Sequence, residues 1–369
     1  MSGGPRFRAD HVGSLLRPRK LAQMRMAVAN GDGNEADLRA IEDEEISAVV
    51  GIQEEIGLKA VTDGEFRRSF WHYDFMGMLT GFELEEREEG IQFAGVKLRP
   101  VFPVIRGILD FPDDHPMLEH FKHVAKISSV TPKISIPGPS CCHFRVGLED
   151  IHPRRYRDAE VLMADIARTY RKAVRAFYDA GCRYLQMDDI FFAYLCDPKH
   201  RKSKAELGQD PDWLIGKYSW MMHEAIRDRP TDMTIAMHMC RGNFRSTHAA
   251  EGGYDPAADA VFNQTGVDVF FMEYDTQRAG GIEPLRLLSK GNQRVMPGFI
   301  TTKSGHLESI DEIRRKIDKA SRIADIDQLG IAPQCGFAST EEGNELSEDE
   351  QWRKLELVVR VADKVWGEI

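Results

Sequence analysis

Two residues near the middle of the chain have the types and spacing of metal ligands. His238 and Cys240 end the apolar run 235–240, which is typical of a buried β-strand. Because successive side chains of a strand alternate in direction, these two point to the same side. An imidazole nitrogen and a thiolate sulfur both suit Zn²⁺, which takes such ligands tetrahedrally. The pair alone also fits a hydrogen-bonded core histidine and a small buried cysteine, so the question is where further ligands lie.

Composition and charge restrict the class of protein. The chain has 369 residues, 42% of them hydrophobic, and a formal net charge of −10. An acidic chain without a long basic run argues against nucleic acid as a partner. The start has no apolar signal segment and the sequence has no run of about 18 apolar residues, so we expect no membrane span. Six cysteines, two of them adjacent, favour reduced thiols in a cytoplasmic protein.

Apolar runs of strand type alternate with runs of helical periodicity along the whole chain. Near-continuous apolar runs are typical of parallel strands that are buried on both faces. Eight such strands, most of them followed by a helix, predict an α/β fold consisting of a single (β/α)₈ barrel. The predicted strands comprise residues 7–12, 59–65, 133–139, 184–189, 234–240, 269–274, 294–300 and 331–336.

Helical spacing of apolar residues places helices between these strands. The predicted helices comprise residues 35–57, 157–180, 203–228, a segment that opens with the capping box of Ser309 and Glu312, and a final segment that contains Trp352. Residues 83–130 break the alternation, because they are charge-rich and then proline-rich. We interpret them as an excursion, a hairpin plus a helix, inserted after the second βα unit of one domain that spans 1–369.

The active-site residues of such a barrel lie at the carboxyl ends of its strands. The polar residues predicted to lie there are Ser14, Glu65, Asp188, His238, Cys240, Glu273 and Cys335. His238, Cys240, Glu273 and Cys335 offer one nitrogen, two sulfurs and one oxygen, a suitable tetrahedral set for Zn²⁺. Alternatives remain for each residue: Glu273 could pair with an arginine of the barrel, Cys335 could be packing, and Ser14 could belong to a simple turn.

The chain resembles a known family in several short motifs. The residues that carry the resemblance are His238 and Cys240, Glu273, and Cys335 in this order, with Gly64 and Glu65 followed by Arg67 and Arg68. They are similar to the catalytic domain of cobalamin-independent methionine synthase. That domain belongs to a wider group of zinc-dependent thiol alkyltransferases, which includes epoxyalkane:coenzyme M transferase. The similarity runs over nearly the whole chain.

The resemblance implies a methyltransferase that makes methionine from homocysteine. It implies zinc ligands at His238, Cys240, Glu273 and Cys335, with a zinc-bound thiolate as the nucleophile. It also implies that Ser14, Glu65 and Asp188 hold homocysteine. The residue types fit these roles, because two carboxylates can hold an ammonium group and the backbone N–H groups near Ser14 can take a carboxylate. We expect a small-molecule thiol and a methyl donor as partners.

Three features depart from the family. The chain has room for one barrel, whereas methionine synthase has two, with the folate tail between them. The aromatic residue that stacks on the pterin has no evident equivalent in residues 140–144, and Lys303 stands where the family has a catalytic histidine. A lysine with its usual pKa of about 10.4 is a poor proton donor at neutral pH. The half of the site that holds the thiol is therefore predicted to be intact, and the half that holds the donor is altered.

Several functions remain open at this stage. Lys303 is the predicted catalytic residue and Arg17 a second candidate for binding the donor's anionic or leaving group. The donor itself could be a folate, methylcobalamin or a small methylated compound. The alternatives are the same zinc chemistry on another thiol such as coenzyme M, a zinc hydrolase, and a catalytically inactive metal- or thiol-binding barrel. The oligomeric state does not follow from the sequence.

Overall fold

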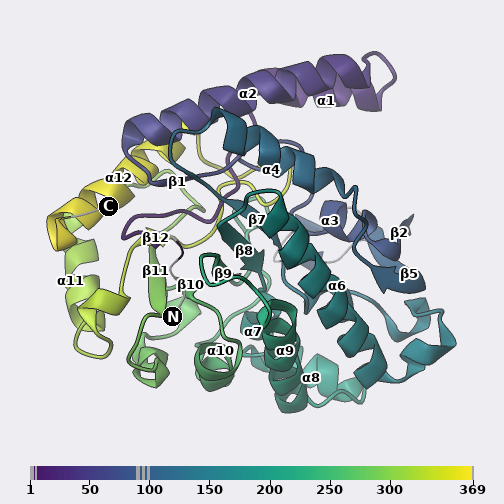
Figure 1. Cartoon of the computed structure of the whole chain (residues 1–369). Helices are drawn as coiled ribbons and strands as arrows, with labels where there is room; N and C mark the ends of the chain where they lie inside the picture. The colour runs from purple at the N-terminus through teal and green to yellow at the C-terminus, as the bar shows by residue number, and fades with distance from the viewer. Residues whose placement is uncertain (1–3, 5, 89–91, 94–95, 98–99, 368–369) are drawn as a thin grey trace.

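Six parallel strands form a curled sheet at the centre of the molecule (Figure 1). The computed structural model describes residues 4, 6–88, 92–93, 96–97 and 100–367. The strands lie in the order β12-β11-β10-β9-β8-β7, and nearly all of their residues are buried, as expected for apolar strands covered on both faces. Their bounds are β7 Ile134–Pro137, β8 Tyr184–Asp188, β9 Thr234–Met239, β10 Val269–Glu273, β11 Arg294–Ile300 and β12 Ala332–Pro333.

A two-stranded ladder extends this arrangement beyond β7. β1 (Ala60–Val61) pairs in parallel with β6 (Thr131–Pro132), and one residue separates β6 from β7. β1 is much shorter than the predicted strand 59–65, because the chain turns at Gly64, where φ is +64°. From β12 to β7 and on to the ladder of β6 and β1, the strands thus follow the order of a barrel. Because β1 ends at Val61, residues 63–65 lie beyond the ladder.

The predicted first strand, residues 7–12, is wrong in its extent. In the described part of the chain it contributes a single parallel bridge, at Ala9, next to β12. A side chain from the interior of the sheet takes up one of its carbonyl groups instead, because Gln186 Nε2 donates to the carbonyl of Val12 at 2.6 Å. The described ladders form a curled half-barrel, so the closed eight-stranded barrel stays a prediction.

Helices cover the outer face of the sheet (Figure 1). Their ends follow capping chemistry: Asn34 accepts a hydrogen bond at the start of α2, and Ser309 and Ser347 form capping boxes for α11 and α12. The predicted helix 203–228 is two helices, because Pro211 can begin a helix but cannot continue one. The bounds are α1 Arg19–Ala29, α2 Glu35–Ile56, α3 Tyr73–Gly77, α4 Pro116–Ile127, α5 Cys141–Phe144, α6 Ala159–Asp179, α7 Phe191–Tyr194, α8 Pro198–Glu206, α9 Pro211–Ile226, α10 Ala258–Gln264, α11 Ile310–Ala320 and α12 Glu348–Trp366.

The excursion contains an antiparallel hairpin, as its composition predicts. β2 (Thr80–Glu86) pairs with β5 (Val101–Asp110), and both project away from the sheet (Figure 1). Two short strands, β3 (Gln92–Phe93) and β4 (Val96–Lys97), pair between them. The helix α4 packs against α2 and α6 and so belongs to the outer layer. The hairpin therefore lies within the second strand-helix unit rather than after it. Residues 89–91, 94–95 and 98–99 lie outside the described residues.

Among the described residues, no helix is both long enough and apolar enough to cross a bilayer. The long helices α2, α6 and α12 are amphipathic instead, with one buried face against the sheet or a neighbouring helix.

Candidate metal centre and substrate cavity

Strand β9 brings the two predicted ligands to the end of the sheet. His238 is its fifth residue, and Cys240 follows its last residue, so both side chains leave the same side of the strand. Parallel pairing with β8 and β10 holds β9 in the middle of the sheet and fixes the height of His238. Both side chains are buried.

Cys335, which follows β12, completes a compact group with this pair. The ligand atoms of His238, Cys240 and Cys335 lie within 4.8 Å of one another, and the two sulfurs are 3.5 Å apart. Zn–S bonds of about 2.3 Å at a tetrahedral angle place two sulfurs about 3.8 Å apart, close to this separation. The buried Nε2 atom of His238 has no hydrogen-bond partner, which a bound metal would supply. The donor set and the unpartnered nitrogen both fit Zn²⁺.

Asp188, at the end of β8, contacts this group through the histidine. Its Oδ1 lies 3.3 Å from Nδ1 of His238 and accepts a hydrogen bond from Gln186 Nε2 at 2.7 Å. A carboxylate on the second nitrogen of a metal-bound histidine fixes its tautomer and orientation. Asp188 also lines the cavity, as predicted, but part of its carboxylate is engaged by His238.

Glu273 lies outside the group of three. Its Oε2 accepts a hydrogen bond from the backbone N–H of Arg241 at 2.7 Å, and its Oε1 forms an ion pair with Arg278. Burial raises the pKa of this carboxyl group, but Lys303, Arg278 and Arg241 together lower it, so it stays ionised. The structure thus brings together three of the four predicted metal ligands, and the fourth is held by arginines.

Glu65 enters the cavity from a strained turn. Its backbone has a φ of +61°, which a side chain other than glycine rarely adopts. Asp63 stabilises the turn by accepting a hydrogen bond from the N–H of Glu65 at 2.9 Å. Ser135 donates to Oε1 at 2.7 Å, whereas the buried Oε2 has no hydrogen-bond partner and lies 3.7 Å from Arg68 Nη1. Burial raises the pKa of Glu65, Arg68 opposes this rise, and Asp188 adds to it.

Ser14 joins the first segment of the chain to the loop that carries Cys335. The N–H of Phe337 donates to the carbonyl of Ser14 at 2.9 Å. A Cβ atom on Gly336 would lie 1.9 Å from Ser14 Oγ, so only glycine permits this approach. Ser14 lines the cavity together with Glu65, as predicted.

Arg17 and Lys303 lie outside the wall of this cavity. The guanidinium of Arg17 donates to four backbone carbonyl oxygens at 2.6–3.1 Å, those of Leu15, Glu65, Arg68 and Ala338. Nζ of Lys303 donates to the carbonyl of Gly242 at 2.8 Å and contacts that of Thr247 at 3.5 Å. Both side chains hold loops around the cavity by donating to backbone carbonyls, and neither is among the residues that line it.

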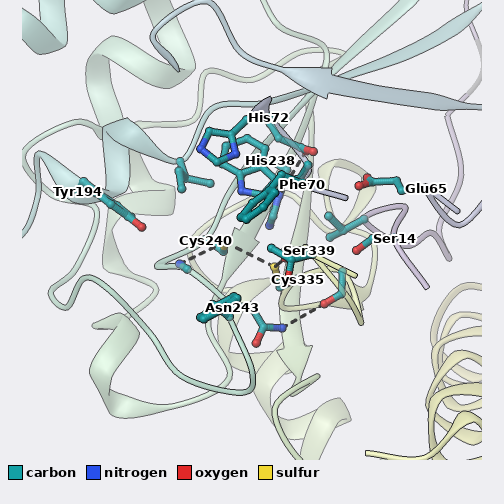
Figure 2. A pocket seen from close by; sticks show the side chains of 18 of the residues that line it. Ser14, Glu65, Phe70, His72, Tyr194, His238, Cys240, Asn243, Cys335 and Ser339 are labelled. Atoms are coloured by element: carbon teal, nitrogen blue, oxygen red, sulfur yellow. Dashed lines mark hydrogen bonds and ion pairs between the residues drawn. The ribbon is translucent and has the colours of Figure 1, made fainter. Parts of the chain in front are cut away.

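The wall of the cavity opposite Ser14 and Glu65 contains none of the predicted site residues. This wall is built by Phe70, His72, Arg145, Tyr194 and Phe244 (Figure 2 shows several of them). The sequence does contain a signal, the aromatic cluster 70–73, but the cluster lies in a loop and has no periodicity that would give it a direction. Arg145 and Tyr194 belong to short helical turns after strands and carry no such signal.

Comparison with known proteins identifies relatives along most of the chain. The uncharacterized proteins YxjG and YxjH of Bacillus subtilis are each 45% identical to it, and the matches cover 90% and 89% of this chain and 87% of each relative. The 5-methyltetrahydropteroyltriglutamate–homocysteine methyltransferase of Mesorhizobium japonicum is 26% identical over 90% of this chain. That match covers 39% of the Mesorhizobium enzyme, so the chain spans about two fifths of it.

Solved structures agree with the sequence comparison. A putative vitamin-B12 independent methionine synthase from Listeria monocytogenes superposes with a TM-score of 0.79, 37% identity and 99% coverage of both chains. A B12-independent methionine synthase from Shewanella sp. W3-18-1 shares the fold, with a TM-score of 0.73, 18% identity and 97% coverage of both chains. The model of the catalytic domain of cobalamin-independent synthases matches residues 7–364. The chain therefore belongs to the cobalamin-independent methionine synthase family.

Proposed function

We propose that this protein is a zinc-dependent methyltransferase that moves a methyl group to the thiol of homocysteine and so makes methionine. The observation that carries the proposal is the cavity that His238, Cys240 and Cys335 share with Glu65 and Ser14. Its family is one of methionine synthase-like proteins, which supports methyl transfer as the type of reaction.

The three clustered side chains would hold the metal. Three protein ligands leave one position of a tetrahedral zinc ion for a substrate, as catalytic zinc sites do. Zn²⁺, when bound, deprotonates a coordinated thiol and makes it a nucleophile at neutral pH. Glu273 remains our proposed fourth ligand in the absence of substrate, and to serve it must exchange its contacts with Arg241 and Arg278 for the metal.

The chain's own carboxylates favour an amino-acid thiol. Oε2 of Glu65 is buried, ionisable and without a hydrogen-bond partner, so an ammonium group placed there would complete its bonding. Asp188 lines the same cavity and adds negative charge. The amino acid's carboxylate would lie beside Ser14. Coenzyme M carries a sulfonate in place of these groups, and Glu65 would repel it.

Zinc-edge X-ray absorption on the purified protein, with and without homocysteine, tests this proposal. We expect two sulfur ligands in the free protein and three after homocysteine is added, with coenzyme M as the comparison thiol. A protein that binds no zinc, or a sulfur count that homocysteine leaves unchanged, would contradict the proposal. A third sulfur with coenzyme M alone would favour the alternative thiol alkyltransferase.

X-ray absorption, together with zinc affinity, also tests Glu273 as the fourth ligand. If Glu273 closes the site, the free protein has one carboxylate oxygen on zinc, and Glu273→Gln weakens zinc binding at least about tenfold without homocysteine. Adding homocysteine should reduce this difference, because the thiol takes the same position. Unchanged zinc affinity together with a lower melting temperature would assign Glu273 to Arg241 and Arg278 alone.

A further inference from the structure

Arg278 lies between two buried carboxylates beside the candidate metal centre. Its Nη2 forms the ion pair with Oε1 of Glu273 and lies 3.9 Å from Oδ1 of Asp275. The two acidic side chains are 0% and 2% exposed, and that of Arg278 is 15% exposed. None of the three is among the residues that line the cavity. Arg278 therefore has two carboxylates within reach and is bonded to one of them.

Asp275 has unused bonding capacity. Neither of its buried carboxylate oxygens has a hydrogen-bond partner, and Nη1 of Arg278 is also buried without one. In the described part of the chain, Arg278 is the one cationic side chain within 4.0 Å of this carboxylate. Buried polar atoms without partners are rare and costly in native proteins. The unused donor and the unused acceptors point to a second arrangement, in which Arg278 binds Asp275.

The backbone around Arg278 is held in place, so this exchange is a movement of the side chain. The N–H of Gly252 donates to the carbonyl of Arg278 at 3.0 Å. Two residues further on, a Cβ atom on Gly280 would lie 2.4 Å from Cα of Gly253, so only glycine permits the two loops to pack this closely. The long arginine side chain can turn from one carboxylate to the other while its backbone stays fixed.

Glu273, the present partner of Arg278, has a competing role as our proposed fourth metal ligand. Its Oε1 cannot bind the guanidinium and a metal ion fully at the same time. If Glu273 turned to the metal and nothing else changed, the largely buried Arg278 would lose its counter-ion. Breaking a buried ion pair in this way is strongly unfavourable. Asp275 removes this cost, because it offers the guanidinium a second carboxylate.

We propose that Arg278 exchanges between Glu273 and Asp275 and so controls whether Glu273 binds the metal. Without a thiol, Glu273 binds the metal and Arg278 binds Asp275. When the thiol takes the fourth position, Glu273 returns to Arg278, which is the arrangement seen in this structure. Arg278 and Asp275 are positioning residues, because they act through Glu273. The inference rests on the proposed function, and it adds the device that sets how tightly the thiol competes for the metal.

Two affinities test this exchange: that for zinc, from competition with a chelator, and that for homocysteine, from calorimetry on the zinc-loaded protein. Asp275→Asn leaves Arg278 on Glu273, so zinc should bind at least about tenfold more weakly without homocysteine. Because the two equilibria are linked, homocysteine should bind more tightly by the same factor, and saturating homocysteine should remove the zinc defect. A zinc defect that homocysteine leaves unchanged would indicate a merely structural role and overturn the proposal.

Arg278→Met should act in the opposite direction. Glu273 loses its ion pair and turns to the metal more readily, so zinc should bind more tightly and homocysteine more weakly, each by at least about fivefold. In the double variant, Asp275→Asn should add nothing to Arg278→Met, because the side chain that couples the two carboxylates is gone. An effect of Asp275→Asn that is equally large in both backgrounds overturns the proposal. Either single variant decides the question if the other fails to fold.

A control variant and the parent protein separate the outcomes. Asp255→Asn removes the same charge from an aspartate that is 59% exposed and pairs with Arg286, and it should change neither affinity. Equal changes in Asp255→Asn and Asp275→Asn would assign the effect to net charge and overturn the proposal. If the parent protein binds no zinc or no homocysteine, the proposed function fails and the exchange fails with it. If the parent binds both and Asp275→Asn has the same affinities, only the exchange is overturned.

Discussion

The two ends of the cavity are built in different ways. One end contains the metal ligands, and we call it the thiol end because our proposal places homocysteine there. It takes its side chains from the ends of sheet strands, with Asp188 on β8, His238 on β9 and Cys335 just after β12. The opposite end takes its side chains from loops and single helical turns, with His72 before α3 and Arg145 after α5. Register and strand period fix the first set, whereas packing between loops fixes the second.

The two ends of the cavity also differ in the chemistry of their side chains. The thiol end holds the clustered ligands His238, Cys240 and Cys335 and the carboxyl groups of Glu65 and Asp188. The opposite end holds the aromatic rings of Phe70 and Tyr194, the buried His72, whose pKa is lowered by burial, and the cation of Arg145. The sheet therefore positions the clustered metal ligands, whereas loops and single helical turns position the aromatic rings and the cation opposite them. The following experiments test how far the two ends are independent.

The largest effect is expected at the thiol end. Cys335→Ser removes one of the two sulfurs and should abolish stoichiometric zinc binding. Methyl transfer should fall at least about a thousandfold, because the metal contributes several kcal/mol to such reactions. Zinc content and activity are measured on the same preparation. Cys182→Ser, which changes an equally buried cysteine at the start of β8, is the matched control and should keep both. Full zinc content in Cys335→Ser would exclude this cysteine from the centre.

A smaller effect at the same end should separate binding from catalysis. Glu65→Gln keeps the shape of the side chain but removes the charge that would face the ammonium group. We expect the KM for homocysteine to rise roughly 10- to 100-fold, in line with about 1.5–3 kcal/mol for a charge-assisted hydrogen bond. The zinc content should not change, since Glu65 is not among the clustered ligands. An unchanged KM in steady-state kinetics would move the ammonium site elsewhere.

A variant of Lys303 tests whether this side chain acts in catalysis or only holds a loop beside the cavity. The sequence predicts it as the catalytic residue, but its Nζ binds the carbonyls of Gly242 and Thr247. If it only holds this loop, Lys303→Met should lower kcat less than about tenfold, the equivalent of about one hydrogen bond, without changing its pH dependence. A loss of several orders of magnitude in Lys303→Met would restore its catalytic role.

A further effect concerns the stability of the protein at acid pH. Burial lowers the pKa of both His115 and His143 to about 4, and that of His72 well below its usual value. These histidines are neutral in the folded protein and titrate near 6.5 when unfolded, so their contribution is complete above pH 6.5 and is lost as the pH falls towards 4. The slope is about 1.4 kcal/mol per pH unit for each.

His143→Gln isolates one of these contributions. Denaturant unfolding of the variant and the parent between pH 8 and 4.5 should give stability curves that converge as the pH falls, because the variant lacks one group that must stay neutral. Metal loss at acid pH affects both proteins and cancels in the difference. Parallel curves would mean that folding does not shift the pKa of His143.

Sequence patterns were most reliable where a residue lies on a regular element. The helix start at Ser309 and the strand ends at Asp188 and Met239 are close to those predicted, because capping and alternation are local rules. The first strand failed for a reason that no local rule contains. Gln186, on β8, reaches across the interior and donates a hydrogen bond to the carbonyl of Val12 at 2.6 Å.

Local sequence patterns are enough to predict the succession of strands and helices and the strand-end side chains that could bind a metal and an amino acid. The partners of those side chains follow from the fold. Glu273 meets Arg241 and Arg278, Arg17 meets backbone carbonyls, and Arg145 meets no carboxylate among the described residues. The physical reason is that a side chain's direction follows from its own backbone, whereas its partner depends on loops that pack from distant parts of the chain.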